Sequence, residues 1–278
     1  QGHWDEAAAL HQIAREAGHD AGNQLAEARA LTDLGDLQFL ADEYPDAAAS
    51  LARALELYRS TGDRAGEASA LTSLGTVQQA TGDSPAAAAS LTRALELHQT
   101  LGDQPGEAGA LTGLGAVQYL TGEYRPAAGS LEQALDLYRR LGDRLGEASA
   151  LTGLSTVQYL TAGHAAAAAS LTRALGLYRD LGDRSGEAEA LLNIAEMTLH
   201  SAAPAQARPY FERALEIAIR IAAPREQARA LEGLGLCCVR ERSAEQGAGL
   251  LREALAIYEA IGSPRARQVE KILGDHAA

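Results

Sequence analysis

The chain has 278 residues, with 37 acidic and 24 basic side chains, and its formal net charge is −13. An acidic chain repels phosphate backbones, so direct binding of nucleic acid is not expected. No stretch approaches the roughly 18 consecutive apolar residues that a membrane span needs, so no membrane partner is expected either. The only cysteines, Cys237 and Cys238, are adjacent, which gives no disulfide framework and favours a reducing, cytoplasmic setting.

A period of 40 residues runs through almost the whole chain. Leucine recurs at this spacing from Leu31 to Leu231, and alanine recurs from Ala54 to Ala254. Glycine marks the same register at Gly62, Gly102, Gly142, Gly182 and Gly262. A fixed period without insertions predicts stacked supersecondary repeats, because one repeat of this size cannot bury enough surface to fold alone.

Each repeat contains two helical patterns. In the third repeat, Leu111, Leu114 and Gln118 are spaced by three and four residues, which indicates one face of a helix, here called helix A. A second pattern, helix B, follows the TGEY turn and runs up to Gly142, which is expected to end it in the left-handed conformation. Asp143 is expected to cap the next helix.

These patterns predict one all-α repeat domain over residues 1–278, with about fourteen helices. A lone helix of a truncated repeat comes first, six helix pairs follow, and a capping helix comes last. The predicted segments are 1–21, 22–61, 62–101, 102–141, 142–181, 182–221, 222–261 and 262–278. Helix A is expected to begin near Gln24, Arg64, Gln104, Arg144, Arg184 and Pro224. Because the chain opens at Gln1 with no methionine, the array is expected to be part of a longer protein.

The third repeat shows the consensus positions of a known family at Leu111, Leu114, Gly115, Gln118, Gly122, Tyr124, Ala127, Leu131 and Ala134. These positions resemble the tetratricopeptide repeat. The 40-residue period and its recurring sequence pattern are similar to those of Pins-type adaptors and of the C-terminal sensor repeats of actinobacterial STAND-type regulators. The departures are a glutamine at the helix A tyrosine position of the first four repeats, and Ser155 and Ala195 at the glycine position. The resemblance implies a right-handed superhelical solenoid of antiparallel helix pairs.

Two sets of residues carry expectations about packing. The first set should face the core between helices and comprises Leu111, Leu114, Leu131 and Leu135. The second set is the recurring glutamine at Gln38, Gln78, Gln118 and Gln158. Each of these amides should hydrogen-bond within its own or the next repeat, because a buried polar group needs a partner.

The sequence shows no motif for catalysis, a cofactor or a metal. Gly113 and Gly115 fall inside a helical pattern with no preceding strand, so they do not form a nucleotide-binding loop and instead allow helices to approach closely. The seven histidines are scattered without a repeated metal-ligand spacing, and His98 stands where other repeats carry tyrosine, as a packing variant. We therefore expect a protein that is not an enzyme and holds no cofactor or metal.

The resemblance implies that helix A lines a concave groove. The expected binding residues are Phe39, Thr72, Thr76, Thr112, Tyr119, Thr152, Thr156, Tyr159 and Asn193. Tyr119 and Tyr159 should lie side by side as anchors for a partner, with threonine hydroxyls close by. No lysine lies in these columns, so the groove favours a neutral or basic helix or extended peptide. The alternative is that the threonines only keep a solvated helix face soluble.

The resemblance also implies a function. It indicates a protein-interaction and sensor module of a larger cytoplasmic bacterial regulator, whose partner is a protein, a peptide or the effector domains of its own full-length chain. Two alternatives stay open: a repeat scaffold attached to an enzyme such as a protease, and a freestanding adaptor.

Overall fold

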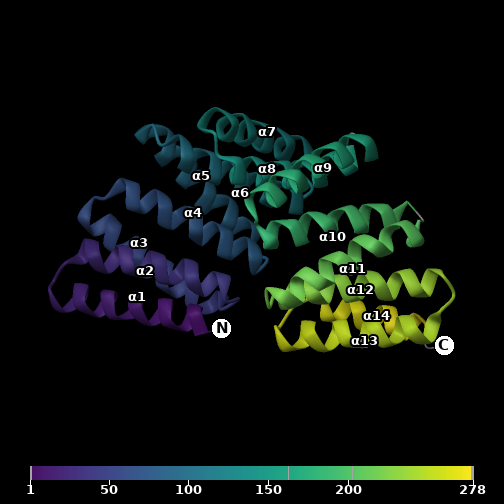
Figure 1. The fold of residues 1–278 in the computed structure, drawn as a ribbon. Helices are drawn as coiled ribbons and strands as arrows, with labels where there is room; N and C mark the ends of the chain where they lie inside the picture. Colours follow the sequence, from purple (N-terminus) through teal and green to yellow (C-terminus); the bar gives the residue numbers. More distant parts are fainter. Residues whose placement is uncertain (1, 162, 202, 277–278) are drawn as a thin grey trace. The chain divides into compact units, whose positions relative to one another are not determined.

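The computed structural model describes the backbone of residues 2–161, 163–201 and 203–276, and the side chains of residues 9–161, 163–201 and 203–275. Within these ranges the secondary structure is α-helical throughout and contains no strand (Figure 1). The helices are α1 (Gly2–Asp20), α2 (Gln24–Leu40), α3 (Tyr44–Thr61), α4 (Arg64–Ala80), α5 (Ser84–Leu101), α6 (Gln104–Leu120), α7 (Tyr124–Leu141), α8 (Arg144–Thr161), α9 (His164–Leu181), α10 (Arg184–His200), α11 (Pro204–Arg220), α12 (Pro224–Arg240), α13 (Ala244–Ala260) and α14 (Ala266–His276). The all-α prediction is confirmed, and the six even-numbered helices α2 to α12 begin at the residues expected for helix A.

Contacts between helices divide the chain into two compact units, residues 1–153 and 154–278, with the boundary inside α8. In the first unit each helix from α1 to α7 packs against the next, and the A helices α2, α4 and α6 also touch one another. In the second unit α9 to α14 pack in the same order, and α10 touches α12. Each unit is therefore a stack of helix pairs joined by short turns.

Local sequence signals set the ends of the helices. Helix B ends at a left-handed glycine in four successive repeats, with φ between 69° and 73° at Gly62, Gly102, Gly142 and Gly182. The next helix A begins at a capping aspartate, as Asp143 shows: its Oδ1 accepts a hydrogen bond from the Gly146 amide at 2.9 Å. Both signals agree with the predicted turn between helix B and helix A.

Glycine inside helix A allows close packing, as expected. A Cβ atom at Gly115 would lie 2.6 Å from Cγ of Leu131 on the paired helix B. One turn into the next helix A, a Cβ at Gly146 would lie 2.2 Å from the Tyr138 ring. These glycines thus match large side chains opposite them, and a methyl group at either position would force its neighbour to move.

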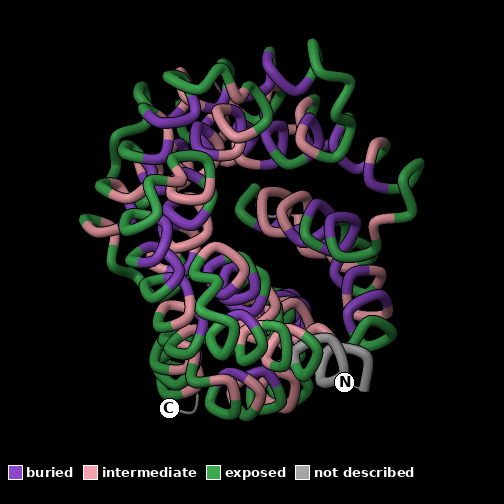
Figure 2. The backbone as a smooth tube through the Cα atoms, turned by 90° about the vertical axis from the view of Figure 1, so that its left-hand side faces the viewer, coloured by how far each residue is buried: buried purple, intermediate pink, exposed green. Residues whose placement is uncertain are grey.

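The core lies between the helices of each unit, and the turns are exposed (Figure 2). Leu111, Leu131 and Leu135 are buried as predicted. Leu114 faces the core as predicted, packed against the cluster that contains Leu91, but it is only half-buried there. Leu114 contacts helix B of the preceding repeat, and part of its side chain remains exposed.

The recurring glutamine has the same partner in four repeats, which confirms the expected hydrogen bond. A serine hydroxyl on helix B, twelve residues later, donates to the glutamine Oε1. The donor–acceptor distances are 2.7–2.8 Å for the pairs Ser50–Gln38, Ser90–Gln78, Ser130–Gln118 and Ser170–Gln158. This bond joins the two helices of one repeat across a half-buried interface.

Candidate interaction surface

The predicted binding residues all lie on A helices, and they divide between the two units. The first unit holds Phe39, Thr72, Thr76, Thr112, Tyr119 and Thr152, and the second holds Thr156, Tyr159 and Asn193. Tyr119 and Tyr159 belong to different units, so their expected pairing stays a prediction.

The threonine hydroxyls of the first unit are engaged within the fold. Thr112 Oγ1 donates to the Ala108 carbonyl at 2.9 Å, one turn earlier in its own helix, and lies 3.4 Å from the Tyr138 hydroxyl of helix B. Thr72 repeats this arrangement with the Ala68 carbonyl. Thr152 is only 5% exposed, so the structure assigns it to the core and corrects its place on the binding surface. The threonines at this position of helix A, Thr72, Thr112 and Thr152, are therefore directed toward helix B and not straight out into solvent.

The remaining threonines stay at the surface. Thr76 and Thr156 are half-buried, one turn further along helix A than Thr72 and Thr152. Thr76 Oγ1 donates to the Thr72 carbonyl at 3.1 Å, so its hydroxyl is left as an acceptor for a partner.

The aromatic side chains near the end of helix A pack against a second aromatic ring at the start of helix B. Phe39 lies 5.8 Å from Tyr44 between ring centroids, and Tyr119 lies 6.0 Å from Tyr124. Each of the four rings keeps part of its surface exposed. The sequence did not predict these pairs, although the spacing of five residues across each turn was visible in it. The rings are thus held in place without being fully buried, which suits an anchor.

Tyr159 in the second unit is also held by its neighbours. Its ring lies 4.7 Å from that of His164 and 6.3 Å from that of His200, both in edge-on arrangements. The three rings come from the ends of α8 and α10 and the start of α9.

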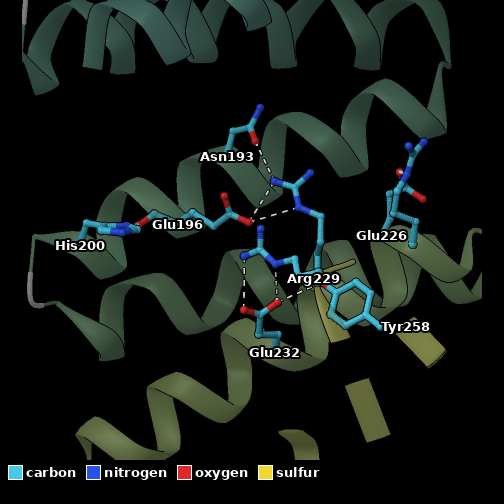
Figure 3. Close-up of polar contacts among 9 residues, drawn as sticks. Asn193, Glu196, His200, Glu226, Arg229, Glu232 and Tyr258 are labelled. Atoms are coloured by element: carbon cyan, nitrogen blue, oxygen red, sulfur yellow. Dashed lines mark hydrogen bonds and ion pairs between the residues drawn. The ribbon is translucent and has the colours of Figure 1, made fainter. Parts of the chain in front are cut away.

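Asn193 belongs to a charged network on α10 and α12 (Figure 3). The Arg229 guanidinium donates to Asn193 Oδ1 at 3.0 Å and to Glu196 Oε1 at 2.9 Å through Nη2, and again to Glu196 Oε1 at 3.2 Å through Nε. The helix A face of the second unit is therefore ionic, whereas the second and third repeats of the first unit present uncharged Thr72, Thr76 and Thr112.

A second, more deeply buried network lies beside it (Figure 3). Glu232 of α12 is only 3% exposed and accepts from Arg265 Nε at 2.8 Å and from the Tyr258 hydroxyl at 3.0 Å. Burial, followed by the negative charge of Glu232, raises the pKa of Tyr258 and keeps its hydroxyl protonated as a donor. The sequence analysis did not find this network, because Arg265 lies 33 residues from Glu232 and outside the repeated positions.

The histidines whose side chains the structure describes lie apart from one another or face single carboxylates. His11 lies 3.5 Å from Asp33 and His19 lies 3.3 Å from Glu27, so each faces a different carboxylate of α2. His98 is buried, as expected for a packing variant. In the part of the chain that the structure describes, no group of three His, Cys, Asp or Glu side chains is placed to hold a metal ion. None of the described helices is long and apolar enough to cross a membrane.

Comparison with known proteins supports the repeat architecture. The tetratricopeptide repeat family model matches residues 39–100 and 66–140. Residues 39–140, which lie in the first unit, therefore consist of tetratricopeptide repeats. No curated protein matches the sequence.

Several solved structures share the fold at low sequence identity. The apo form of RapI has 12% identity and a TM-score of 0.73, with 93% of each chain covered. A Rap protein complexed with competence and sporulation factor has 14% identity and a TM-score of 0.70, with 91% of this chain and 77% of that chain covered. A STAND protein with a tetratricopeptide repeat sensor, from Pyrococcus horikoshii, has 14% identity and a TM-score of 0.63. That match covers 90% of this chain but 41% of the STAND protein.

Proposed function

We propose that this chain is a non-catalytic interaction module that binds a neutral or basic peptide or helix on its helix A faces. We further propose that it is the sensor part of a larger cytoplasmic regulator. The observation that carries the proposal is the tetratricopeptide array with an uncharged helix A face in the second and third repeats, bordered by the partly exposed ring of Tyr119. The fold likeness to a Rap protein with a bound factor and to a STAND sensor supports both statements.

The geometry favours main-chain recognition on the first unit's face. The helix A side chains of the second and third repeats are short here, with Ser73, Gly113 and Ala116 beside Thr76. A partner backbone can therefore approach the helices closely, and Tyr119 then supplies a large apolar contact at low entropic cost. Asp33 and Asp36 of α2 add negative charge at one end, which disfavours an anionic partner.

The test is a double variant, Tyr119→Ala with Tyr159→Ala, measured on the full chain. An array of immobilised peptides of neutral, basic and acidic composition serves as the probe. We expect neutral or basic peptides to be retained and the double variant to lose about 2 kcal/mol or more of binding free energy. Its melting temperature should stay within about 5 °C of the wild type, because these rings are only half-buried.

Tyr210→Ala is the matched control, since this tyrosine is 38% exposed on a B helix. It should bind the same peptides as the wild type. Unchanged peptide binding by the double variant, or retention of acidic peptides alone, would remove the proposal.

A further inference from the structure

The charge of this protein is concentrated in one unit. Residues 1–153 carry 22 acidic and 10 basic side chains, a net charge of −12, whereas residues 154–278 carry 15 and 14, a net charge of −1. Within the first unit, several arginines are already paired on or after the B helices, for example Arg59 with Glu67 and Arg139 with Glu147. With 10 basic against 22 acidic side chains, most carboxylates of this unit have no cation to pair with.

Five of the carboxylates lie where helix A turns into helix B. The turns α2–α3, α4–α5 and α6–α7 lie along one edge of the first unit, because α2, α4 and α6 stack on one another. We call this the A–B edge. Its carboxylates are Asp42, Glu43, Asp46, Asp83 and Glu123. None of the five forms an ion pair with any side chain that the structure describes, and the one cation beside them is Arg125.

Apolar side chains are exposed on the same edge. Leu40 is 61% exposed and Leu120 is 55% exposed, each at the C-terminal end of its helix A. Each leucine adjoins a ring pair, Phe39 with Tyr44 and Tyr119 with Tyr124. The intervening repeat has small or polar side chains at the equivalent positions, so the edge carries two separate apolar clusters. Exposed apolar clusters rimmed by charge mark an interaction site.

We infer that the A–B edge of the first unit docks a cationic amphipathic segment of a partner protein. Leucine and aromatic side chains of the edge contact the apolar side of that segment, and the five carboxylates contact its lysines or arginines. The sign of the charge excludes nucleic acid and anionic lipid as occupants. A second copy of this chain is a poor occupant, because its first unit carries a net charge of −12 and its second unit has no net positive charge.

The test measures binding of a model peptide to the full chain. The probe is a peptide of about 18 residues of leucine and lysine, with leucine at helical spacing so that one side is apolar. The two comparison peptides are a scrambled sequence of the same composition and a version with glutamate in place of lysine. The expected result is that only the amphipathic cationic peptide binds, and that its affinity falls as salt rises.

Two variants of the edge and two matched controls assign the site. Leu40→Ser with Leu120→Ser, and separately Glu43→Lys with Asp46→Lys, should each weaken binding at least about tenfold. The apolar control is Leu101→Ser with Leu141→Ser, which are exposed at the ends of B helices, and the charge control is Glu132→Lys with Asp136→Lys on α7. Both controls should stay within about twofold of the wild type.

Three results would overturn the inference. They are no binding of the amphipathic peptide by the wild type, equal binding of the scrambled peptide, and equal weakening by the controls. The edge variants keep every helix A residue named for the proposed function, and Tyr159, unlike Tyr119, lies outside the A–B edge. Tyr159→Ala alone therefore tests the helix A faces separately, so the two proposals can fail independently.

Discussion

Single side chains on the two helices of a repeat change together. The glutamine at the end of helix A is replaced by Thr198 in the fifth repeat and by Cys238 in the sixth. The serine that donates to it is replaced in the same repeats by Tyr210 and Leu250. A serine without its acceptor would lose a half-buried hydrogen bond, so the pair is kept or lost as a whole. Gly146 and the Tyr138 ring form a second pair of this kind. At the equivalent positions two repeats later, the tyrosine is replaced by Ala218 and the glycine by Glu226, so both partners change together.

Ala222 tests how much the left-handed glycines contribute to stability. It stands in the register of Gly182 and has a φ of 54°, although a Cβ is unfavourable in this conformation. Ala222→Gly should therefore raise the free energy of unfolding by about 0.5–1 kcal/mol, after the extra entropy of the unfolded chain is subtracted. Gly182→Ala should lower it by about 1 kcal/mol.

Urea denaturation of the two variants measures both changes. Ala218→Gly, inside α11 and fully buried, is the control and should lower the stability, because glycine is unfavourable inside a helix. A loss of stability in Ala222→Gly would show that the backbone at this turn is not strained.

At the scale of elements, α14 is attached differently from the other helices. The earlier repeats place threonine or leucine where α12 has Glu232. Among the ion pairs that the structure describes, Arg229 with Glu196 and Arg208 with Glu241 also span 33 residues, and both lie near α12. Val269 of α14 is fully buried, so apolar packing and the Arg265–Glu232 pair act together. A carboxylate buried to this degree is costly without its cation.

Removing one partner should release α14. We expect Arg265→Leu to lower the free energy of unfolding of the last helices by about 2–3 kcal/mol, because Glu232 is left buried and uncompensated while Arg265 itself is partly solvated. The double variant with Glu232→Thr, which restores the residue of the first four repeats, should recover a large part of that loss. Hydrogen exchange of the α14 amides measures both effects.

The exposed pair Arg213–Glu216 on α11 is the matched control. Glu216→Gln should leave exchange in α14 unchanged. Equal protection of α14 in the wild type and in Arg265→Leu would mean that apolar contacts alone hold the helix.

At the scale of the whole molecule, the repeat period determined nearly everything that sequence could predict. The positions of Leu111 and Gly142 in their columns were enough to place helices and turns, because each repeat obeys the same local rules. Which side chains are exposed on the surface was harder to predict from the sequence. A shift of one position around a helix decides whether a side chain such as Thr152 is buried or exposed. Pairs such as Arg265 with Glu232 involve residues that differ from those at the equivalent positions of the other repeats, so comparing the repeats could not predict them.

Because each repeat contacts mainly its neighbours, damage to one should spread along the chain only gradually. Leu131 is 1% exposed and lies against Gly115 and Gly153, so Leu131→Ala should cost about 2–5 kcal/mol locally. Hydrogen exchange should show the loss first in α6 and α7, then in the helices next to them, and last in α12 and α13. The control is Leu141→Ala at an exposed position of the same helix, which should leave exchange close to that of the wild type. An equal loss of protection in α6 and α12 would mean that the array unfolds as one cooperative body, and the local coupling argued here would be wrong.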